Sequence, residues 1–126
     1  MILDSNIVIY AAEPSDLRCA QFIERETAAI ASVTRIEVLG FPGYYGLAID
    51  RKRRLHEIVA GLLEIKLDDV ITERAIGLRR QKRLRLADAI IAATAIVNNL
   101  ELVTRNIADF KHIAGLCVIN PFDDQD

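Results

Sequence analysis

Short apolar runs alternate with longer helical segments along this chain, and this alternation is the feature that most constrains its fold. The runs that we expect to form strands are residues 1–3, 28–32, 64–67, 101–104 and 117–120. The segments with helical character are residues 5–12, 16–26, 33–39, 47–63, 70–81 and 86–99. Short apolar strands separated by helices are typical of parallel sheets that are covered on both faces. The sequence therefore predicts a three-layer α/β/α sandwich around a central, mostly parallel sheet of four or five strands.

The chain is expected to form a single domain. Its 126 residues are a common domain length, and a hydrophobic content of 52% supplies ample material for a core. The second helix is expected to begin at an N-cap, either Ser15 or Asp16. The glycine-bounded segment 40–46 is the clearest loop. Because no internal boundary is evident, we expect the domain to span residues 1–120 and a loose tail to cover 121–126.

Composition and charge argue against several classes of protein. The formal net charge of −2 does not suggest a nucleic-acid binder of the overall basic kind. Cys19 and Cys117 lie far apart in sequence and fit two buried thiols in a reducing cytosol. With only His56 and His112 to add, they do not build a zinc site. Met1 enters a strand-like segment directly, and no apolar run approaches about 18 residues, so we expect a cytoplasmic protein without signal peptide or membrane span.

Several side chains with oxygen ligands lie at or just beyond the apolar runs. They are Asp4, Glu37, Asp88, Asn106 and Asp109. In open α/β sheets, ligands bind beyond the carboxyl ends of the strands, so these distant residues could line one pocket. Acids in such places are costly to bury unless a cation meets them. Since Mg²⁺ and Mn²⁺ prefer oxygen ligands, the sequence predicts a divalent-metal site.

Each of these side chains also has an ordinary structural interpretation. Asp4 could be a helix N-cap, and Asp88 could simply suit the N-terminal end of a helix dipole. The helix after Asp88 is rich in alanine, however, and allows close packing, so Asp88 is expected to be drawn towards the interior. Glu37 could lie on a solvated helix face, although its neighbours are apolar. Asn106 and Asp109 could serve turn chemistry.

Basic residues are bunched in two runs despite the negative net charge. One run is residues 51–54, and the other comprises Arg79, Arg80, Lys82, Arg83 and Arg85. Such strips can hold phosphates even on an acidic protein, and the second run leads directly into Asp88. Either run could instead be a solvated face. Tyr44 and Tyr45 could stack on bases, although we favour rim packing or an interface.

Four segments together resemble the PIN domain, and within it the VapC-type toxins of prokaryotic type II toxin–antitoxin pairs. The segments are residues 2–6, 34–40, 86–95 and 103–110. Each alone is a weak signal, but their order and spacing over nearly the whole chain make the resemblance specific. It implies a PIN-like fold and a Mg²⁺- or Mn²⁺-dependent endoribonuclease that hydrolyses RNA phosphodiester bonds.

The resemblance also implies roles for particular residues. The metal ligands would be Asp4, Asp88, Glu37, Asn106 and Asp109. The catalytic acids would be Asp4, Glu37 and Asp88, with Glu37 orienting or deprotonating the attacking water. Many relatives carry aspartate where this chain has Asn106, so the sequence does not decide whether Asn106 or Asp109 fills the fourth position. Thr104 could donate a hydrogen bond nearby.

The same resemblance implies partners. A homodimer is expected, together with a small VapB-like antitoxin that wraps the toxin's helices and blocks the acidic pocket. RNA would be the substrate. The alternative is a non-catalytic PIN-like binding module that serves as an antitoxin or RNA platform, and the neutral Asn106 is its best support.

Overall fold

The computed structural model describes residues 1–13, 17–25 and 27–122. The strands are β1 (Ile2–Leu3), β2 (Ala29–Ala31), β3 (Leu63–Ile65), β4 (Leu102–Val103) and β5 (Val118–Ile119). The helices are α1 (Ser5–Ala11), α2 (Arg18–Arg25), α3 (Ser32–Gly40), the 3-10 helix η1 (Tyr44–Gly46), α4 (Ile49–Ala60), α5 (Asp69–Gln81), α6 (Leu86–Val97) and α7 (Ile107–Phe110). The N-cap predicted at Ser15 or Asp16 lies outside the described residues.

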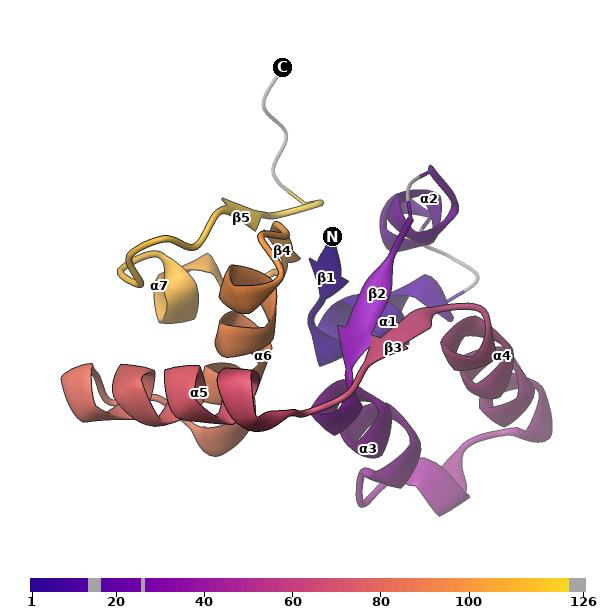
Figure 1. The fold of residues 1–126 in the computed structure, drawn as a ribbon. Helices are drawn as coiled ribbons and strands as arrows, with labels where there is room; N and C mark the ends of the chain where they lie inside the picture. Colours follow the sequence, from indigo (N-terminus) through magenta and orange to yellow (C-terminus); the bar gives the residue numbers. More distant parts are fainter. Residues whose placement is uncertain (14–16, 26, 123–126) are drawn as a thin grey trace.

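The strands form one five-stranded sheet in the order β3-β2-β1-β4-β5, and every pair is parallel. Strand β1 is central, since Ile2 is in register with Ala29 on one side and with Leu102 on the other. The carboxyl ends of all the strands therefore lie along the same edge of the sheet. Figure 1 shows this sheet between two groups of helices, and the predicted α/β/α sandwich is confirmed.

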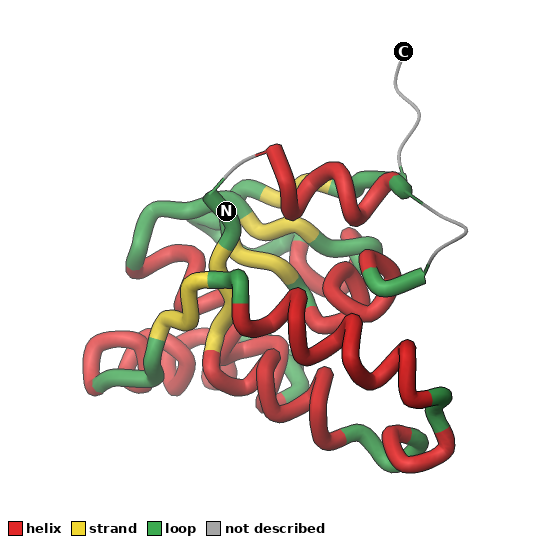
Figure 2. The backbone as a smooth tube through the Cα atoms, turned by 90° about the vertical axis from the view of Figure 1, so that its right-hand side faces the viewer, coloured by secondary structure: helices red, strands yellow, loops and turns green. Residues whose placement is uncertain are grey.

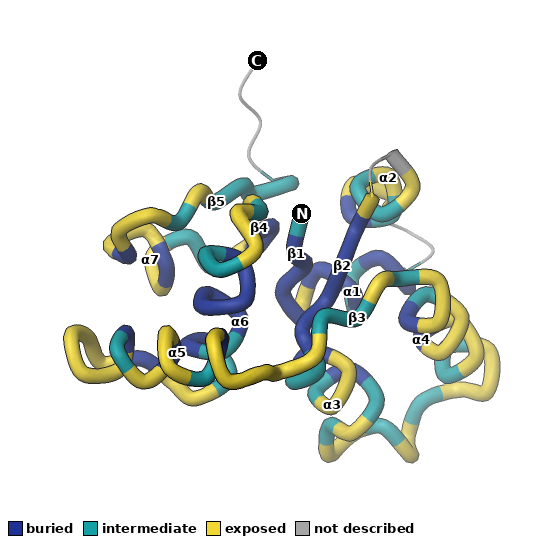
Figure 3. The backbone as a smooth tube through the Cα atoms, in the orientation of Figure 1, coloured by how far each residue is buried: buried dark blue, intermediate teal, exposed yellow. Residues whose placement is uncertain are grey.

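Helices cover both faces of the sheet (Figure 1 and Figure 2). On one face, residues of α5, α6 and α7 form a core with Ile2 and Ala29. On the other, residues of α1, α2 and α4 form a core with Leu3 and Ile30. Neighbouring residues of a strand enter different cores because successive side chains point to opposite faces. Figure 3 shows β1 and β2 mostly buried, whereas the outer sides of the helices are exposed.

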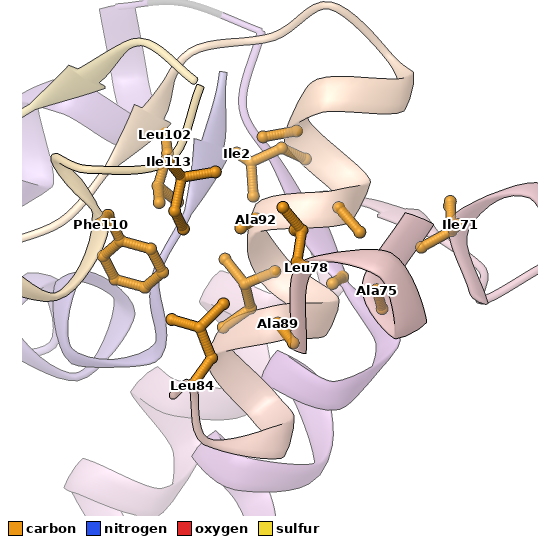
Figure 4. Close-up of a cluster of buried hydrophobic side chains, with 14 of the residues drawn as sticks. Ile2, Ile71, Ala75, Leu78, Leu84, Ala89, Ala92, Leu102, Phe110 and Ile113 are labelled. Carbon is orange, nitrogen blue, oxygen red and sulfur yellow. The ribbon is translucent and has the colours of Figure 1, made fainter. Parts of the chain in front are cut away.

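Helix α6 lies close to the sheet because small residues form its inner side. Ala89, Ala92, Ala93 and Ala95 are all fully buried. Figure 4 shows Ala89 and Ala92 within the same cluster as side chains of α5 and α7. A helix without bulky side chains at the contact can approach its neighbours closely. This packing also carries the first turn of α6, which contains Asp88, towards the interior.

The elements differ from the sequence prediction mainly at their ends. Strand β1 stops at Leu3 because Asp4 already caps α1. Helix α4 covers only Ile49–Ala60 of the expected 47–63, since Gly61 is its C-cap and β3 follows almost at once. Helix α7 was not expected, because its single turn of four residues is too short to show a helical period.

Phe122, in the expected tail, contacts the body of the domain. Its ring lies 4.5 Å from the guanidinium carbon of Arg18 and 4.6 Å from that of Arg105. It also meets the Tyr10 ring edge-to-face, with 5.3 Å between the centroids. A domain end at residue 120 stays a prediction, and residues 123–126 lie outside the described part of the chain.

The two cysteines have different surroundings. Cys19 is buried as expected, but the expectation was wrong for Cys117, which is exposed. Cys117 precedes β5, an edge strand whose residues are only partly buried, so the described part of the chain leaves it exposed. Within the described residues, no helix combines the length and the apolar character needed to cross a bilayer.

Candidate active site

Asp4 stands where β1 ends and α1 begins, and its exposed fraction is only 6%. Its Oδ1 accepts a hydrogen bond from the backbone nitrogen of Ser5 at 2.7 Å, and its Oδ2 accepts one from the Thr104 hydroxyl at 2.7 Å. The Thr104 oxygen in turn accepts from the backbone nitrogen of Asn106 at 3.0 Å. Residues a hundred positions apart meet because β1 and β4 are neighbouring strands. Asp4 is therefore both the cap of α1 and a carboxylate held from a second strand.

Burial raises the pKa of Asp4 above the usual value for an aspartate. The hydrogen bonds from Thr104 and Ser5 act in the opposite direction because they favour the charged form, but they do not cancel the effect of burial. The nearby charge of Glu37 raises the pKa further. A cation at this place would relieve both the burial and the repulsion.

Glu37 contacts α1 and is only partly exposed to solvent. It lies on α3, it is half-buried, and its Oε1 accepts a hydrogen bond from the Ser5 hydroxyl. Since Ser5 follows Asp4 directly, this bond brings the Glu37 carboxylate into the neighbourhood of Asp4. Ser5 thus links two acids that come from different elements.

Asp88 lies in the first turn of α6 with an exposed fraction of 7%, so it is drawn inwards as expected. Its Oδ2 accepts a hydrogen bond from Nε of Arg85 at 3.2 Å. Burial raises the pKa of Asp88, and the charges of Asp4 and Asp109 raise it further, while Arg85 acts in the opposite direction. The acids of four distant segments thus lie near enough to influence one another.

A cavity adjoins Asp88 and has both acidic and basic walls. It is lined by Lys82, Arg83, Leu84, Arg85, Asp88, Ala108, Asp109 and His112. Asp109 is exposed and shares this cavity with Asp88, whereas Asn106 is half-buried at the start of α7. The negative charge that acts on Asp88 from α7 therefore comes from Asp109.

Sequence reasoning missed the roles of three residues near the acids. Arg85 precedes Asp88 by three positions, a spacing that brings side chains together on a helix and could have indicated the pair. Ser5 gave no signal of its contact with Glu37, because that contact depends on how α1 and α3 pack. His112, to which the sequence assigned no catalytic role, is exposed and lines the cavity.

The donor chemistry of this region fits a divalent cation. Across the part of the chain that the structure describes, no three histidine, cysteine, aspartate or glutamate side chains form a ready-made metal cluster. Nevertheless, Asp4 and Asp88 are carboxylates that burial penalises and positive charge would stabilise. The cation now paired with Asp88 is Arg85, whose side chain is 77% exposed. Hard oxygen donors with a surplus of negative charge are what Mg²⁺ prefers.

The two basic runs have different surroundings. In the run 51–54, Arg51 forms two hydrogen bonds to the Glu13 carboxylate, at 2.8 and 3.1 Å. Arg54 donates to the backbone carbonyls of Ala11 and Ala12. Arg51 and Arg54 therefore tie α4 to the C-terminal end of α1, a contact that neither the phosphate-binding nor the solvated-face interpretation predicted. The second run supplies the basic wall of the cavity beside Asp88.

The two loop tyrosines also differ from one another. The Tyr44 hydroxyl lies 2.6 Å from Nε2 of His56, and its ring meets Phe41 edge-to-face. Tyr45 is 88% exposed, and Nζ of Lys52 lies 5.8 Å from the centre of its ring. Tyr44 thus packs against the rim of the domain, as favoured from the sequence, while Tyr45 faces solvent.

Comparisons with known proteins give one family and a consistent set of folds. The PIN domain matches residues 1–116. A chain of a toxin–antitoxin complex from Klebsiella pneumoniae is 32% identical, with a TM-score of 0.77 over 97% of this chain and 98% of that one. VapBC2 from Rickettsia felis, bound to a promoter DNA fragment, is 24% identical with a TM-score of 0.74, covering 94% and 96% of the two chains.

A further structure shares the same fold. DNA-bound VapBC from Salmonella typhimurium is 20% identical with a TM-score of 0.76, over 95% of this chain and 96% of that one. No curated protein sequence matches significantly. Because the family match covers most of the chain and the fold agrees over nearly all of it, the chain belongs to the PIN-domain family, and its resemblance to VapC-type toxins is confirmed.

Proposed function

We propose that this protein is a divalent-metal-dependent endoribonuclease and the toxin of a toxin–antitoxin pair. The observation that carries the proposal is the pair of nearly buried carboxylates, Asp4 and Asp88, which come from different elements. Burial raises the pKa of both, and the charge of Asp4 raises that of Asp88 further. Carboxylates whose pKa values are shifted in this way are typical of functional sites. Membership of the PIN-domain family supports nuclease chemistry at these residues.

We assign the metal to Mg²⁺ or Mn²⁺. The side chains that would hold it, directly or through water, are Asp4, Asp88, Glu37, Asn106 and Asp109. Such an ion supplies positive charge that makes a bound water more acidic and neutralises a phosphate. Of the two candidates for the fourth position, we favour Asp109, because its charge acts on Asp88 and it lines the same cavity.

The protein's own residues would orient the reaction. Glu37 is assigned as the base, because its Oε1 is fixed by Ser5 and its Oε2 can accept a proton from the attacking water. Thr104 holds Oδ2 of Asp4 in a fixed position and is a positioning residue. Two separate strands and two helices thus define the directions of the carboxylates.

RNA would approach along the basic wall beside Asp88. Lys82 and Arg83 line the cavity there, and lysine and arginine neutralise phosphates wherever they lie close to a nucleic-acid backbone. We further propose a homodimer and a small VapB-like antitoxin whose basic side chain would occupy the acidic pocket. The Klebsiella pneumoniae chain that is 32% identical comes from a toxin–antitoxin complex, which supports a partner of this kind.

The second candidate is a non-catalytic PIN-like module that binds an antitoxin or RNA. Two observations favour it: the position at which many relatives carry aspartate holds the neutral Asn106, and no three metal-binding side chains converge among the described residues. A single assay separates the two functions, because only an enzyme turns over RNA when metal is supplied.

The test uses antitoxin-free protein, cleared of metal with EDTA, on total RNA with and without Mg²⁺ or Mn²⁺. Asp4→Asn and Asp88→Asn should each reduce cleavage by about 100-fold or more, since each removes charge at the reacting centre. Asp50→Asn is the matched control, because Asp50 is 92% exposed and, among the described residues, forms a salt bridge only with Arg53 one helical turn away. It should cleave like the parent protein.

Circular dichroism of all variants confirms that the fold is retained. Cleavage that survives in both Asp4→Asn and Asp88→Asn would remove the assignment of these acids. If the parent protein fails to cleave RNA with either metal but still binds it, the non-catalytic module is the correct function.

A further inference from the structure

Arg85 is the cation that the acidic cluster already possesses. Its Nε donates to Oδ2 of Asp88 at 3.2 Å. The charge of Arg85 also lowers the pKa of Asp4, and the charges of Glu37 and Asp109 raise the pKa of Arg85. No other salt bridge to these acids occurs among the described residues. A single guanidinium therefore partly neutralises carboxylates from several elements.

The two partners of the Arg85–Asp88 ion pair differ in how firmly they are held. The Asp88 side chain is 10% exposed and fixed by α6, whereas the Arg85 side chain is 77% exposed and stands at the N-cap position of that helix. The single contact is made by Nε and is not a two-pronged guanidinium–carboxylate pair. Because solvent screens the exposed guanidinium, we expect this contact to contribute little to stability. Asp88 is therefore held in place by α6, whereas the Arg85 side chain can move away from it.

A divalent cation at the acids would compete with Arg85 in two ways. It would use oxygens of Asp88, one of which now accepts the Arg85 hydrogen bond. It would also place two positive charges near a guanidinium, and like charges at short range repel. Both effects displace the more mobile partner, which is the arginine.

We propose that Arg85 is an exchangeable counter-ion of the acidic cluster, paired with Asp88 in the metal-free protein and released into the adjoining cavity when a divalent cation binds. The cavity lies open beside it, since Arg85 and Asp88 both line it. There the released guanidinium joins Lys82 and Arg83 on the basic wall, where an RNA phosphate would pass. Arg85 thus competes with the metal for Asp88 and, once released, is available to the substrate phosphate. This inference rests on the proposed function, because it requires a metal at the acids.

The test is metal affinity, measured by titration calorimetry with Mn²⁺ at pH 8 in the absence of RNA. Removing the competing charge in Arg85→Gln should tighten Mn²⁺ binding about fivefold, the scale expected for an exposed ion pair. Arg85→Lys keeps a charge and should bind within about twofold of the parent. Arg83→Gln is the matched control, because Arg83 lines the same cavity but makes no salt bridge among the described residues. It should also change affinity by less than about twofold.

A second measurement works on the unaltered side chain. In an NMR titration of the parent protein with Mg²⁺, the Arg85 Nε–H signal should move and exchange faster as its acceptor is lost. The signal is assigned by its disappearance in Arg85→Lys. This arm keeps the inference testable even if Arg85→Gln does not fold.

The outcomes separate this inference from the proposed function. Equal or weaker Mn²⁺ binding by folded Arg85→Gln, or an Nε–H signal unchanged at saturating Mg²⁺, would overturn the inference and leave the enzyme assignment intact. Absence of metal binding by the parent protein would overturn both. Tighter binding in Arg85→Gln alone, with release of the Nε–H signal, would establish the exchange.

Discussion

Replacing Thr104 by valine tests whether Asp4 is held as a charged group. Thr104 is fully buried, and its hydroxyl donates to Oδ2 of Asp4 while accepting from the backbone nitrogen of Asn106. Valine has nearly the same shape, so the change removes two hydrogen bonds without opening a cavity. What remains is a nearly buried carboxylate with one bond, from the backbone of Ser5.

The loss of stability in Thr104→Val can be worked out from the two hydrogen bonds that the change removes, one to a charged group and one between neutral groups. A hydrogen bond to a charged group contributes about 1.5–3 kcal/mol, and a neutral backbone bond about 0.5–1.5 kcal/mol. The Asn106 nitrogen belongs to a half-buried residue that water can partly reach. We therefore expect Thr104→Val to lower the free energy of unfolding by about 2–4 kcal/mol at pH 8.

The loss should depend on pH in a defined direction. The bond from Thr104 favours the charged form, so removing it raises the pKa of Asp4 further. The difference between the two proteins is complete where Asp4 is ionised in both. It shrinks as the pH falls first through the variant's Asp4 pKa and then through that of the parent.

Two other buried threonines provide matched controls for the same chemical change. Thr94 donates only to the carbonyl of Ile90 within α6, so Thr94→Val should cost less than about 1 kcal/mol at any pH. Among the described residues, the fully buried Thr34 hydroxyl has no hydrogen-bond partner. Thr34→Val should therefore be neutral or stabilising, because it removes a polar group that burial penalises.

The assay is urea unfolding in EDTA at pH 8 and pH 4, followed by circular dichroism. Thr104→Val within about 0.5 kcal/mol of Thr94→Val at pH 8 would refute the reasoning, because the charged bond would then be worth no more than a neutral one. A loss that is the same at both pH values would also contradict it.

Two further predictions concern charge and packing. The pKa of Asp88 is raised in the folded protein, so its contribution to stability is complete below the ordinary aspartate pKa and is lost as the pH rises through the raised value. The metal-free parent protein should therefore lose stability relative to Asp88→Asn between pH 4 and pH 8. Urea midpoints for both proteins check this, and a pH-independent difference would contradict it. Phe122→Ala should cost about 1–3 kcal/mol in thermal unfolding, since it removes contacts with Arg18, Arg105 and Tyr10. Tyr45→Ala, at a site 88% exposed, should stay within about 0.5 kcal/mol of the parent, and equal melting of the two variants would count against the packing argument.

The sequence by itself determined the fold class. Short, mostly apolar runs that alternate with helices are typical of a parallel sheet covered on both faces. It also placed Asp4 at the end of β1 and Asp88 in the first turn of α6, because hydrophobic period and alanine content are local properties. Even the Arg85–Asp88 pair was implicit in a spacing of three residues on one helix.

Only the tertiary structure decided which distant side chains meet at the acids. The Thr104–Asp4 bond exists because β4 lies beside β1, and the Ser5–Glu37 bond exists because α1 packs on α3. Asp109 acts on Asp88 because α7, a single turn with no readable period, lines the same cavity as the first turn of α6. Local patterns fix what each segment becomes, since they depend on neighbouring residues. The contacts between segments depend on strand order and helix packing, and these set the distances through which charges and hydrogen bonds act.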